Sequence, residues 1–448
     1  MALASGPPPT AIGLLRLSGP GSLGKLKGLL TPLRGRASYD RTLRQYRFVD
    51  PNTGETIDDL TAVFFQHPKS YTGEDAAELF CHGGPYIVRR ILAALKDAGF
   101  RMAEPGEFTR RAFLNGKLDL TSAEGINELI GAQSHTQWLA ARSLASGRLK
   151  EAIDGLRDHL ISAHALMAAR IDFPDEGDTQ DVSLVAVVQA VDQAIMGIDQ
   201  LLGSYEAGRI AAAGLMVALV GEPNVGKSTL MNTLLGRERA LVSAVAGTTR
   251  DYLEERCLVD GRLIRLVDTA GLRVTEDEVE AMGVDRTKKI LGDADVVLWL
   301  SESSQCHDLS TKIDGKDLRP GGRVIRVATK CDLIGDQSGM LMPEWLPLSV
   351  KSGQGLVELK KAIIGACDEA TGSLSEEASF ITTERHAMAL IEARKILGNV
   401  LDVAGARGFD ECLDFELREA SRALGSIIGA LDTDDILDRV FSEFCIGK

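Results

Sequence analysis

The segment at residues 221–228 constrains the fold more than any other part of the chain. Its sequence, GEPNVGKS, matches the pattern GxxxxGK[ST]. It follows the apolar run at 215–220 directly and precedes residues 229–235, whose apolar side chains have helical spacing. In such a strand, loop and helix, backbone N–H groups surround phosphates. We therefore predict a phosphate-binding loop (P-loop) in a parallel sheet, with the Lys227 charge on the β- and γ-phosphates and the Ser228 hydroxyl on Mg²⁺.

Three further motifs follow in the order of a guanine-nucleotide site. The sequence DTAG at 268–271 ends an apolar run, which places a carboxylate near the metal and a glycine amide near the γ-phosphate. The sequence TKCD at 329–332 ends another run, and its aspartate can accept hydrogen bonds from N1–H and the exocyclic amine of guanine. The sequence SVK at 349–351 falls where a last guanine-contacting loop is expected. Together the four elements predict guanine rather than adenine.

Two positions bear on hydrolysis. Residue 272 is Leu, where Ras-like enzymes carry the Gln that orients the attacking water, so another group must hold the water. The acidic run at 276–280 either supplies a carboxylate or is only solvated loop charge. Thr249, in the sequence GTTRD at 247–251, can give its hydroxyl oxygen to Mg²⁺.

Composition indicates an ordinary globular protein of two to four domains, since the 448 residues are 44% hydrophobic and 25% charged. The net charge of -14 argues against non-specific coating of nucleic acid. Seven scattered cysteines and the lack of a run of about 18 apolar residues predict a cytoplasmic protein outside the membrane, with reduced thiols. Five arginines form either a local basic patch or solvated helix faces: Arg89, Arg90, Arg101, Arg110 and Arg111.

The periodicity divides the chain into four segments. Residues 1–116 mix short β-branched and aromatic runs with a helical stretch at 85–98, typical of an α+β domain. Residues 117–208 read as helical, with a capping-box sequence, TSAE, at 121–124. Residues 209–372 alternate strands and helices, and 373–448 return to helices. We therefore predict a Ras-like α/β domain, parallel-rich with helices on both faces, inserted into a helical domain.

The chain ends in the sequence CIGK at 445–448. The preceding apolar residues recur at helical spacing, and Asp432 or Thr433 can cap that helix. Cys445 is therefore either a nucleophile, with Lys448 as one cation able to lower its pKa, or a small semi-buried residue at a helix end.

Five segments spread along the chain carry a family resemblance. They are YTGED at 71–75, CHGGP at 81–85, PGEFTRRAFLNGKLDL at 105–120, IDFPDE at 171–176 and the terminal CIGK. With the nucleotide motifs, the chain resembles the MnmE/TrmE family of tRNA-modification GTPases. The resemblance implies a potassium-activated GTPase that dimerises through an N-terminal tetrahydrofolate-binding domain. With the FAD-dependent partner MnmG (GidA), in a heterotetramer or larger assembly, it would install an aminomethyl or carboxymethylaminomethyl group at C5 of a tRNA wobble uridine.

The resemblance also implies roles for single residues. A 5-formyl- or 5,10-methylene-tetrahydrofolate would contact Arg16, Glu78, Lys117 and Lys448. Potassium would bind Asn224, Ser243, Val245 and Thr248, while Glu280 would orient the water in place of the missing Gln. The catalytic candidates are then Lys227, Glu280 and Cys445, and the Mg²⁺ ligands are Ser228 and Thr249. The residues expected at GTP are Asn224, Val225, Gly226, Lys227, Ser228, Thr229, Ser243, Ala244, Val245, Ala246, Gly247, Thr248, Thr249, Asp268, Thr269, Ala270, Gly271, Thr329, Lys330, Asp332, Ser349, Val350 and Lys351.

Two other interpretations remain. The chain could be a GTP-dependent RNA-binding or ribosome-assembly switch without modification chemistry. Its N-terminal region could also be a dimerisation scaffold with a vestigial folate pocket. The folate contacts and the terminal CIGK distinguish these from the first reading.

Overall fold

A computed structural model describes most of the chain, and its residues form two compact units. The first comprises 1–124 with 428–448, and the second comprises 125–427. The described residues are 1–36, 40–172, 177–236, 254–268, 288–304, 306, 318–333, 343–372, 374–375, 378–404, 410–430 and 434–447, with the backbone alone at 177–183 and 434–436.

The first unit is built on an antiparallel six-stranded sheet in the order β1-β2-β6-β5-β4-β3. Alternate residues of its strands point into a core with α2, in which Leu15, Leu60 and Leu95 are buried. Helix α2 (Pro85–Asp97) confirms the helix predicted at 85–98. It begins with a proline, which suits the first position of a helix. The elements of this unit are β1 (Ala2–Leu3), β2 (Ile12–Ser18), α1 (Ser22–Leu26), β3 (Leu30–Pro32), β4 (Arg44–Val49), β5 (Thr56–Phe65), β6 (Ala76–His82), α2 (Pro85–Asp97), α3 (Glu107–Leu114), the first turn of α4 (Leu120–Gly131) and α14 (Asp434–Ser442).

The last residues of the chain fold back onto the first unit. Phe441 of α14 packs in one cluster with Phe113 and Leu120. Beyond that helix, Ile446 forms a β-bridge with Pro105. Gly106 fits this close approach because its φ is +65° and a Cβ there would lie 2.6 Å from the Phe441 carbonyl oxygen. The implied position of the tail beside the N-terminal domain is thus confirmed.

The start of α4 differs from the capping box predicted at 121–124. The cap is Asp119, whose carboxylate accepts a hydrogen bond from the Ser122 amide at 2.9 Å. Thr121 lies inside the first turn, and its hydroxyl donates to the same carboxylate. Aspartate is as good a cap as threonine, and the apolar Leu120 enters the helix because it packs under Phe441.

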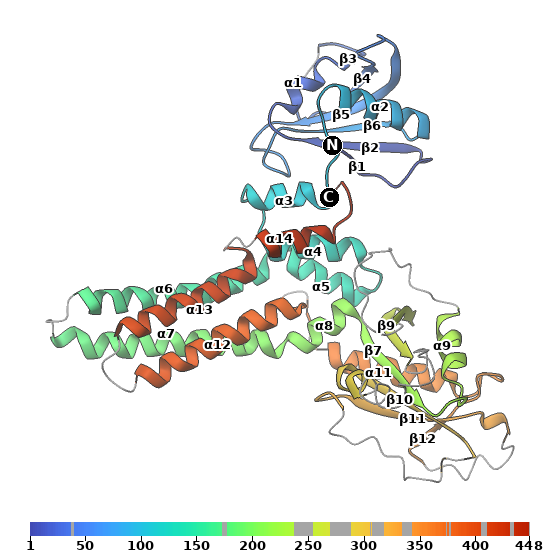
Figure 1. The fold of residues 1–448 in the computed structure, drawn as a ribbon, viewed down its shortest axis with the longest axis vertical. Coiled ribbons are helices and arrows are strands. Elements are labelled where there is room, and N and C mark those ends of the chain that lie inside the picture. Colours follow the sequence, from blue (N-terminus) through green and yellow to red (C-terminus); the bar gives the residue numbers. More distant parts are fainter. Residues whose placement is uncertain are drawn as a thin grey trace, which may run out of the picture. The chain divides into compact units, whose positions relative to one another are not determined.

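The second unit contains a set of long helices. Helices α6, α7, α12 and α13 run side by side (Figure 1). A hydrogen bond between His164 and Asp414 and an ion pair between Arg170 and Asp410 join α6 to α13. Within the segment predicted as helical, 117–208, one helix begins at 177, and the next continues to 213. One helical stretch among the described residues, Leu184–Ala213, is long and apolar enough to cross a membrane, judged by length and composition alone. Core helices of other proteins pass the same test. The helices are α5 (His135–Ala145), α6 (Arg148–Asp172), α7 (Gly177–Gly203), α8 (Tyr205–Ala213), α12 (Glu384–Ala404) and α13 (Asp410–Ile428).

The same unit holds the sheet that carries the P-loop, in the order β12-β11-β10-β7-β9-β8. All neighbouring pairs in it are parallel except β8 with β9. Leu234 and Leu359 of two helices cover one face, and Ile290 and Leu291 cover the other, so the predicted fold class is confirmed. The elements are β7 (Leu215–Gly221), α9 (Lys227–Leu235), β8 (Glu254–Val259), β9 (Arg262–Asp268), β10 (Val296–Glu302), β11 (Arg323–Thr329), the short 3-10 helix η2 (Cys331–Leu333), β12 (Trp345–Pro347) and α11 (Leu356–Thr371).

A buried carboxylate joins α8 to this sheet. Asp295, directly before β10, accepts a hydrogen bond from the Met216 amide at 2.8 Å and pairs with Arg209 and Arg319. Arg319 also pairs with Glu206 of α8. Burial acts to lower the pKa of Arg209, and the charge of Asp295 outweighs it and raises the pKa. The cluster therefore fixes the first half of α8, which carries Glu206 and Arg209, to the first residues of β7 and β10.

Candidate functional site

The P-loop connects β7 to α9 in the conformation that surrounds phosphates. Gly226, the cap of α9, has a φ of +108°, which favours glycine. Lys227 is only 6% exposed, and its Nζ donates to the carbonyl oxygens of Gly221 and Glu222, each at 2.7 Å. Burial lowers the pKa of Lys227, while the charge of Asp268 acts the other way. The ammonium group is thus held inside the loop where anionic phosphates would lie.

Two oxygens beside the loop suit a hard divalent cation. The Ser228 Oγ, at the start of α9, donates to the Asp268 Oδ2 at 3.1 Å, at the end of β9. Asp268 is nearly buried. A hydroxyl and a carboxylate on neighbouring elements, together with phosphate oxygens, are the ligands that Mg²⁺ takes in nucleotide sites. The residues present therefore fit the metal that the sequence predicts.

The strand end at TKCD is tied to the P-loop. The buried Thr329 donates its hydroxyl to the Val225 carbonyl oxygen at 2.7 Å. The next residue, Lys330, has a φ of +57°, and its Nζ donates to the Glu302 Oε2 at 3.0 Å. The hydroxyl joins the predicted base-reading segment to the predicted phosphate-binding segment.

The predicted guanine-reading residues lie together. A hydrogen bond from Ser349 lowers the pKa of Asp332, against burial and with help from the charge of Lys351. The Cys331 amide donates to the Leu348 carbonyl oxygen at 3.3 Å, which joins the two loops. An ionised carboxylate at this place is the acceptor that guanine N1–H and its amine require.

Other predicted residues of this site lie outside the described part of the chain. They are Ser243, Ala244, Val245, Ala246, Gly247, Thr248, Thr249, Thr269, Ala270, Gly271 and Glu280, along with Leu272. The described members are brought to one edge of the sheet, at the carboxyl ends of β7, β9 and β11, as expected for an open α/β sheet.

The predicted folate residues lie in the first unit. Arg16 and Glu78 face each other across β2 and β6, with Arg16 Nε 2.9 Å from Glu78 Oε1. Arg16 Nη1 also donates to the carbonyl oxygen of Gly447 in the tail at 3.0 Å, and its guanidinium lies over the Phe108 ring. The role of the Gly447 carbonyl could not be predicted from the sequence, because every residue type carries the same backbone oxygen.

The remaining tail and loop candidates are less closely gathered. Lys117 is exposed and lies beside Gly73, where a Cβ on that glycine would be 3.3 Å from the lysine Cε. Cys445 is exposed, three residues beyond the end of α14, so it is not the semi-buried residue at a helix end of the alternative interpretation. Lys448 lies outside the described residues.

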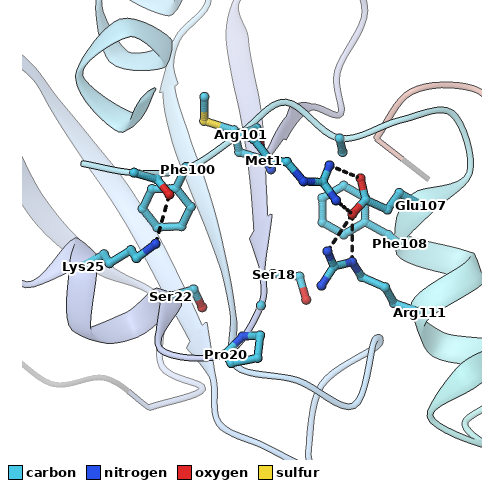
Figure 2. Close-up of a pocket in the computed structure, with 13 residues that line it drawn as sticks. Met1, Ser18, Pro20, Ser22, Lys25, Phe100, Arg101, Glu107, Phe108 and Arg111 are labelled. Carbon is cyan, nitrogen blue, oxygen red and sulfur yellow. Dashed lines mark hydrogen bonds and ion pairs between the residues drawn. The ribbon is translucent and has the colours of Figure 1, made fainter. Parts of the chain in front are cut away.

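A cavity of about 130 Å³ in the first unit has Ser18 and Phe108 in its wall. Phe108 is also the ring over which the Arg16 guanidinium lies. Figure 2 shows Arg101 and Arg111 converging on Glu107 at one side and Lys25 stacked on Phe100 at the other. The five arginines that the sequence assigns either to a basic patch or to solvated helix faces are mostly neutralised by carboxylates. The pairs are Arg90 with Asp50 and Glu55, Arg101 and Arg111 with Glu107, and Arg110 with Asp438. The five therefore do not form a basic patch.

Glu107 provides a prediction about acid stability. Burial acts to raise its pKa, but hydrogen bonds from Arg101, the Glu104 amide and Arg111 outweigh it and lower the pKa from 4.5 to about 2. A carboxyl with a depressed folded-state pKa contributes stability above its unfolded pKa, and this is lost as the pH falls. We expect Glu107→Gln to lose less stability than wild type between about pH 4.5 and about pH 2, by about 1 kcal/mol after allowance for solvent screening. Thermal unfolding against pH measures this, with the exposed Glu55→Gln as control; equal slopes for Glu107→Gln and wild type would contradict it.

The sheet, the P-loop and the guanine-reading loops define a P-loop GTPase. A family model described as the MnmE helical domain matches residues 120–445, and one described as the GTP-binding protein TrmE N-terminus matches residues 1–117. The chain belongs to the MnmE family of tRNA modification GTPases, and it is a GTP hydrolase. The predicted family is thereby confirmed.

Two relatives with the name tRNA modification GTPase MnmE match this chain over its full length. The tRNA modification GTPase MnmE of Hyphomonas neptunium is 38% identical over 454 residues, covering 100% of this chain and 98% of the relative. That of Thermus thermophilus is 38% identical over 452 residues, with the same coverage. Among solved structures, Era in complex with MgGDPNP and nucleotides of 16S ribosomal RNA is 30% identical and covers 40% of this chain and 66% of its own, with a TM-score of 0.26.

Proposed function

We propose that the chain is the GTPase component of an enzyme that modifies the wobble uridine of certain tRNAs. It would add an aminomethyl or carboxymethylaminomethyl group at C5, with a tetrahydrofolate derivative as one-carbon donor. The observation that carries this proposal is the contact between Arg16 and the carbonyl of Gly447, beside Glu78. An RNA-binding switch without modification chemistry has no need of a second site, assembled from the two ends of the chain.

For hydrolysis, the described residues bind and orient the nucleotide. Lys227 places its charge at the β- and γ-phosphates, and Asp332 accepts from guanine. Ser228, Asp268 and Thr249 hold Mg²⁺, which when bound neutralises phosphate charge. Asn224, whose φ is +64°, is a proposed ligand of K⁺ together with Ser243, Val245 and Thr248, in the place where other GTPases use an arginine finger. Glu280 orients the attacking water, because Leu272 stands where Ras-like enzymes carry the glutamine that does so.

For modification, the first unit offers groups that match the chemistry of folate. The Glu78 carboxylate suits the donor edge of a pterin, and Arg16 and Lys117 suit the glutamate carboxylates. Lys448 adds a further cation from the tail. Cys445, an exposed thiol near this tail contact, is a candidate nucleophile.

The partners follow from the same proposal. A homodimer formed through the N-terminal domain would work in the cytoplasm with the FAD-binding MnmG. MnmG would supply the redox cofactor and part of the tRNA-binding surface, which suits a chain with a net charge of -14.

One reconstitution tests these components together. Unmodified tRNA is incubated with the chain, MnmG, FAD, NADH, GTP, Mg²⁺, K⁺ and a tetrahydrofolate donor, and wobble nucleosides are measured by mass spectrometry. We expect the C5 adduct from the full mixture and its loss when the chain, GTP or folate is omitted. Replacing K⁺ by Na⁺ should lower both the adduct and the GTPase rate. GTP hydrolysis without any adduct in the full mixture would support the switch instead, and an unchanged adduct without folate would support the scaffold interpretation.

A further inference from the structure

We infer that the outer ends of β3 and β4 form a surface that binds the phosphate backbone of tRNA. The surface consists of Arg34, Arg36, Arg41, Arg44 and Lys69, here called the basic tip. The inference rests on the proposed function, in which tRNA is the substrate, and it assigns part of the tRNA contact to this chain itself.

The charge of this part of the sequence is opposite to that of the chain. Residues 25–47 contain seven lysines and arginines and one acidic residue, in a chain with a net charge of -14. Arginine and lysine concentrated on one element are the feature that recognises nucleic-acid phosphates. The arginines at 89–111, later in this domain, are by contrast mostly neutralised by carboxylates.

The strand pairing brings these cations together. Pro32 pairs with Tyr46 in the β3–β4 register, and the Leu33 amide donates to the Gln45 carbonyl oxygen at 3.1 Å, so the next step sets Arg34 opposite Arg44. Like charges opposite each other in a sheet are destabilising. An anion bound across both side chains would relieve this repulsion.

A second set of contacts anchors the tip and adds Lys69. The Arg41 guanidinium lies over the Phe65 ring, with its carbon 5.6 Å from the ring centroid, and donates to the Lys69 carbonyl oxygen. The Phe64 amide donates to the Asp40 carbonyl oxygen at 3.1 Å. Arg41 is thus the anchor, although it too is exposed, and the other exposed cations of the tip are Arg34, Arg36, Arg44 and Lys69.

The acidic neighbours do not cancel this charge. Asp40 lies 3.7 Å from Arg44, and the two side chains are 50% and 42% exposed. An ion pair of this kind is worth about 0–1 kcal/mol and yields readily to a phosphate. By contrast, Glu107 is nearly buried and holds Arg101 and Arg111 firmly.

An extended polyanion fits the basic tip better than a small anion. The cations are exposed and spread along two chain segments, whereas a site for one small anion gathers its donors in a cavity. Charged residues can also protect an edge strand such as β3 from pairing with other chains. Edge protection works with either sign of charge, and RNA binding requires the positive sign.

The position of the basic tip is compatible with the candidate folate site. In the sheet order, β3 lies four strands from β2, which carries Arg16 (Figure 1). At about 4.8 Å per strand this is about 19 Å. RNA phosphates on the basic tip would therefore leave the Arg16–Glu78 pair open.

The test uses the full chain and fluorescence anisotropy of a labelled, unmodified tRNA at several salt concentrations. The double variant Arg34→Glu with Arg44→Glu should bind at least about tenfold more weakly near 0.1 M salt. The slope of log affinity against log salt should become shallower by about 1 to 2. The pair Arg34→Lys with Arg44→Lys keeps the charge and should bind within about threefold of wild type.

A matched control makes the same change in net charge elsewhere. Lys395→Glu with Arg422→Glu, on exposed positions of α12 and α13, should leave tRNA affinity within about twofold of wild type. Equal losses in both double variants would overturn the inference, because only net charge would matter. Unchanged affinity in Arg34→Glu with Arg44→Glu, at an unchanged thermal midpoint, would also overturn it and leave the tip to an acidic protein partner. Either result would leave the reconstitution assay, and hence the proposed function, standing.

Discussion

Replacing Lys227 with alanine is expected to lower the rate of GTP hydrolysis by at least about 100-fold and to weaken nucleotide binding. The ammonium group is almost buried, and it donates to two carbonyl oxygens of its own loop. No other described cation has been placed at the phosphates, so its loss removes the positive charge that stabilises the transition state. Single-turnover hydrolysis and binding of a fluorescent GDP analogue measure the two effects. Lys361→Ala, on an exposed position of α11, is the control and should change neither.

A second variant separates binding from hydrolysis. Glu280→Ala should keep nucleotide affinity close to wild type and lower turnover by about 100-fold or more, because a positioned carboxylate acts on the attacking water. If affinity fell as far as turnover, Glu280 would support the fold rather than the reaction. A Lys227→Ala protein that hydrolysed GTP normally would remove the P-loop lysine from the mechanism.

Replacing Asp295 with alanine is expected to cost about 3 kcal/mol of stability, since it removes the buried carboxylate that pairs with two largely buried arginines and leaves a backbone amide without its acceptor. The Asp295 side chain is 7% exposed and accepts from Arg209, Arg319 and the Met216 amide. Urea unfolding of the full chain followed by tryptophan fluorescence should show an early transition. Two of the three tryptophans, Trp299 and Trp345, lie in the sheet that Asp295 supports.

Two comparisons show whether burial is the cause. Asp199→Ala removes the partner of Arg394 in a pair whose side chains are 46% and 51% exposed, and it should cost at most about 1 kcal/mol. Asp295→Asn keeps an acceptor for the Met216 amide and should lie between the two. Equal costs for Asp199→Ala and Asp295→Ala would mean that the buried cluster contributes no more than a surface pair.

The nucleotide-binding fold could be predicted because its signals are local. A strand, a glycine-rich loop and a helix are adjacent in the sequence, and apolar runs of a parallel sheet are continuous, so the sequence predicts β7, β9 and β11. The antiparallel β8 could not be predicted in this way, because its first three residues, 254–256, are all charged. The cap of α4 was misplaced by two residues because several good caps follow one another.

The parts that could not be predicted depend on residues far apart in the chain. Arg209 and Asp295 are 86 residues apart, and Arg16 meets Gly447 across 431 residues. No spacing rule relates such partners, because the packing of whole elements brings them together. For the same reason the sequence left open whether Arg101 and Arg111 form part of a basic patch or solvated helix faces, and only the fold shows that Glu107 neutralises both.

The hydrogen bond from Thr329 to the Val225 carbonyl has a consequence for how the nucleotide is held. It joins two loops that are 104 residues apart, one for the base and one for the phosphates. The two halves of the site are therefore aligned before any nucleotide arrives, and aligning them costs no further conformational entropy on binding. Guanosine and pyrophosphate, as separate fragments, would each find a finished half-site. Thr329 thus contributes to affinity through preorganisation of the two halves of the site.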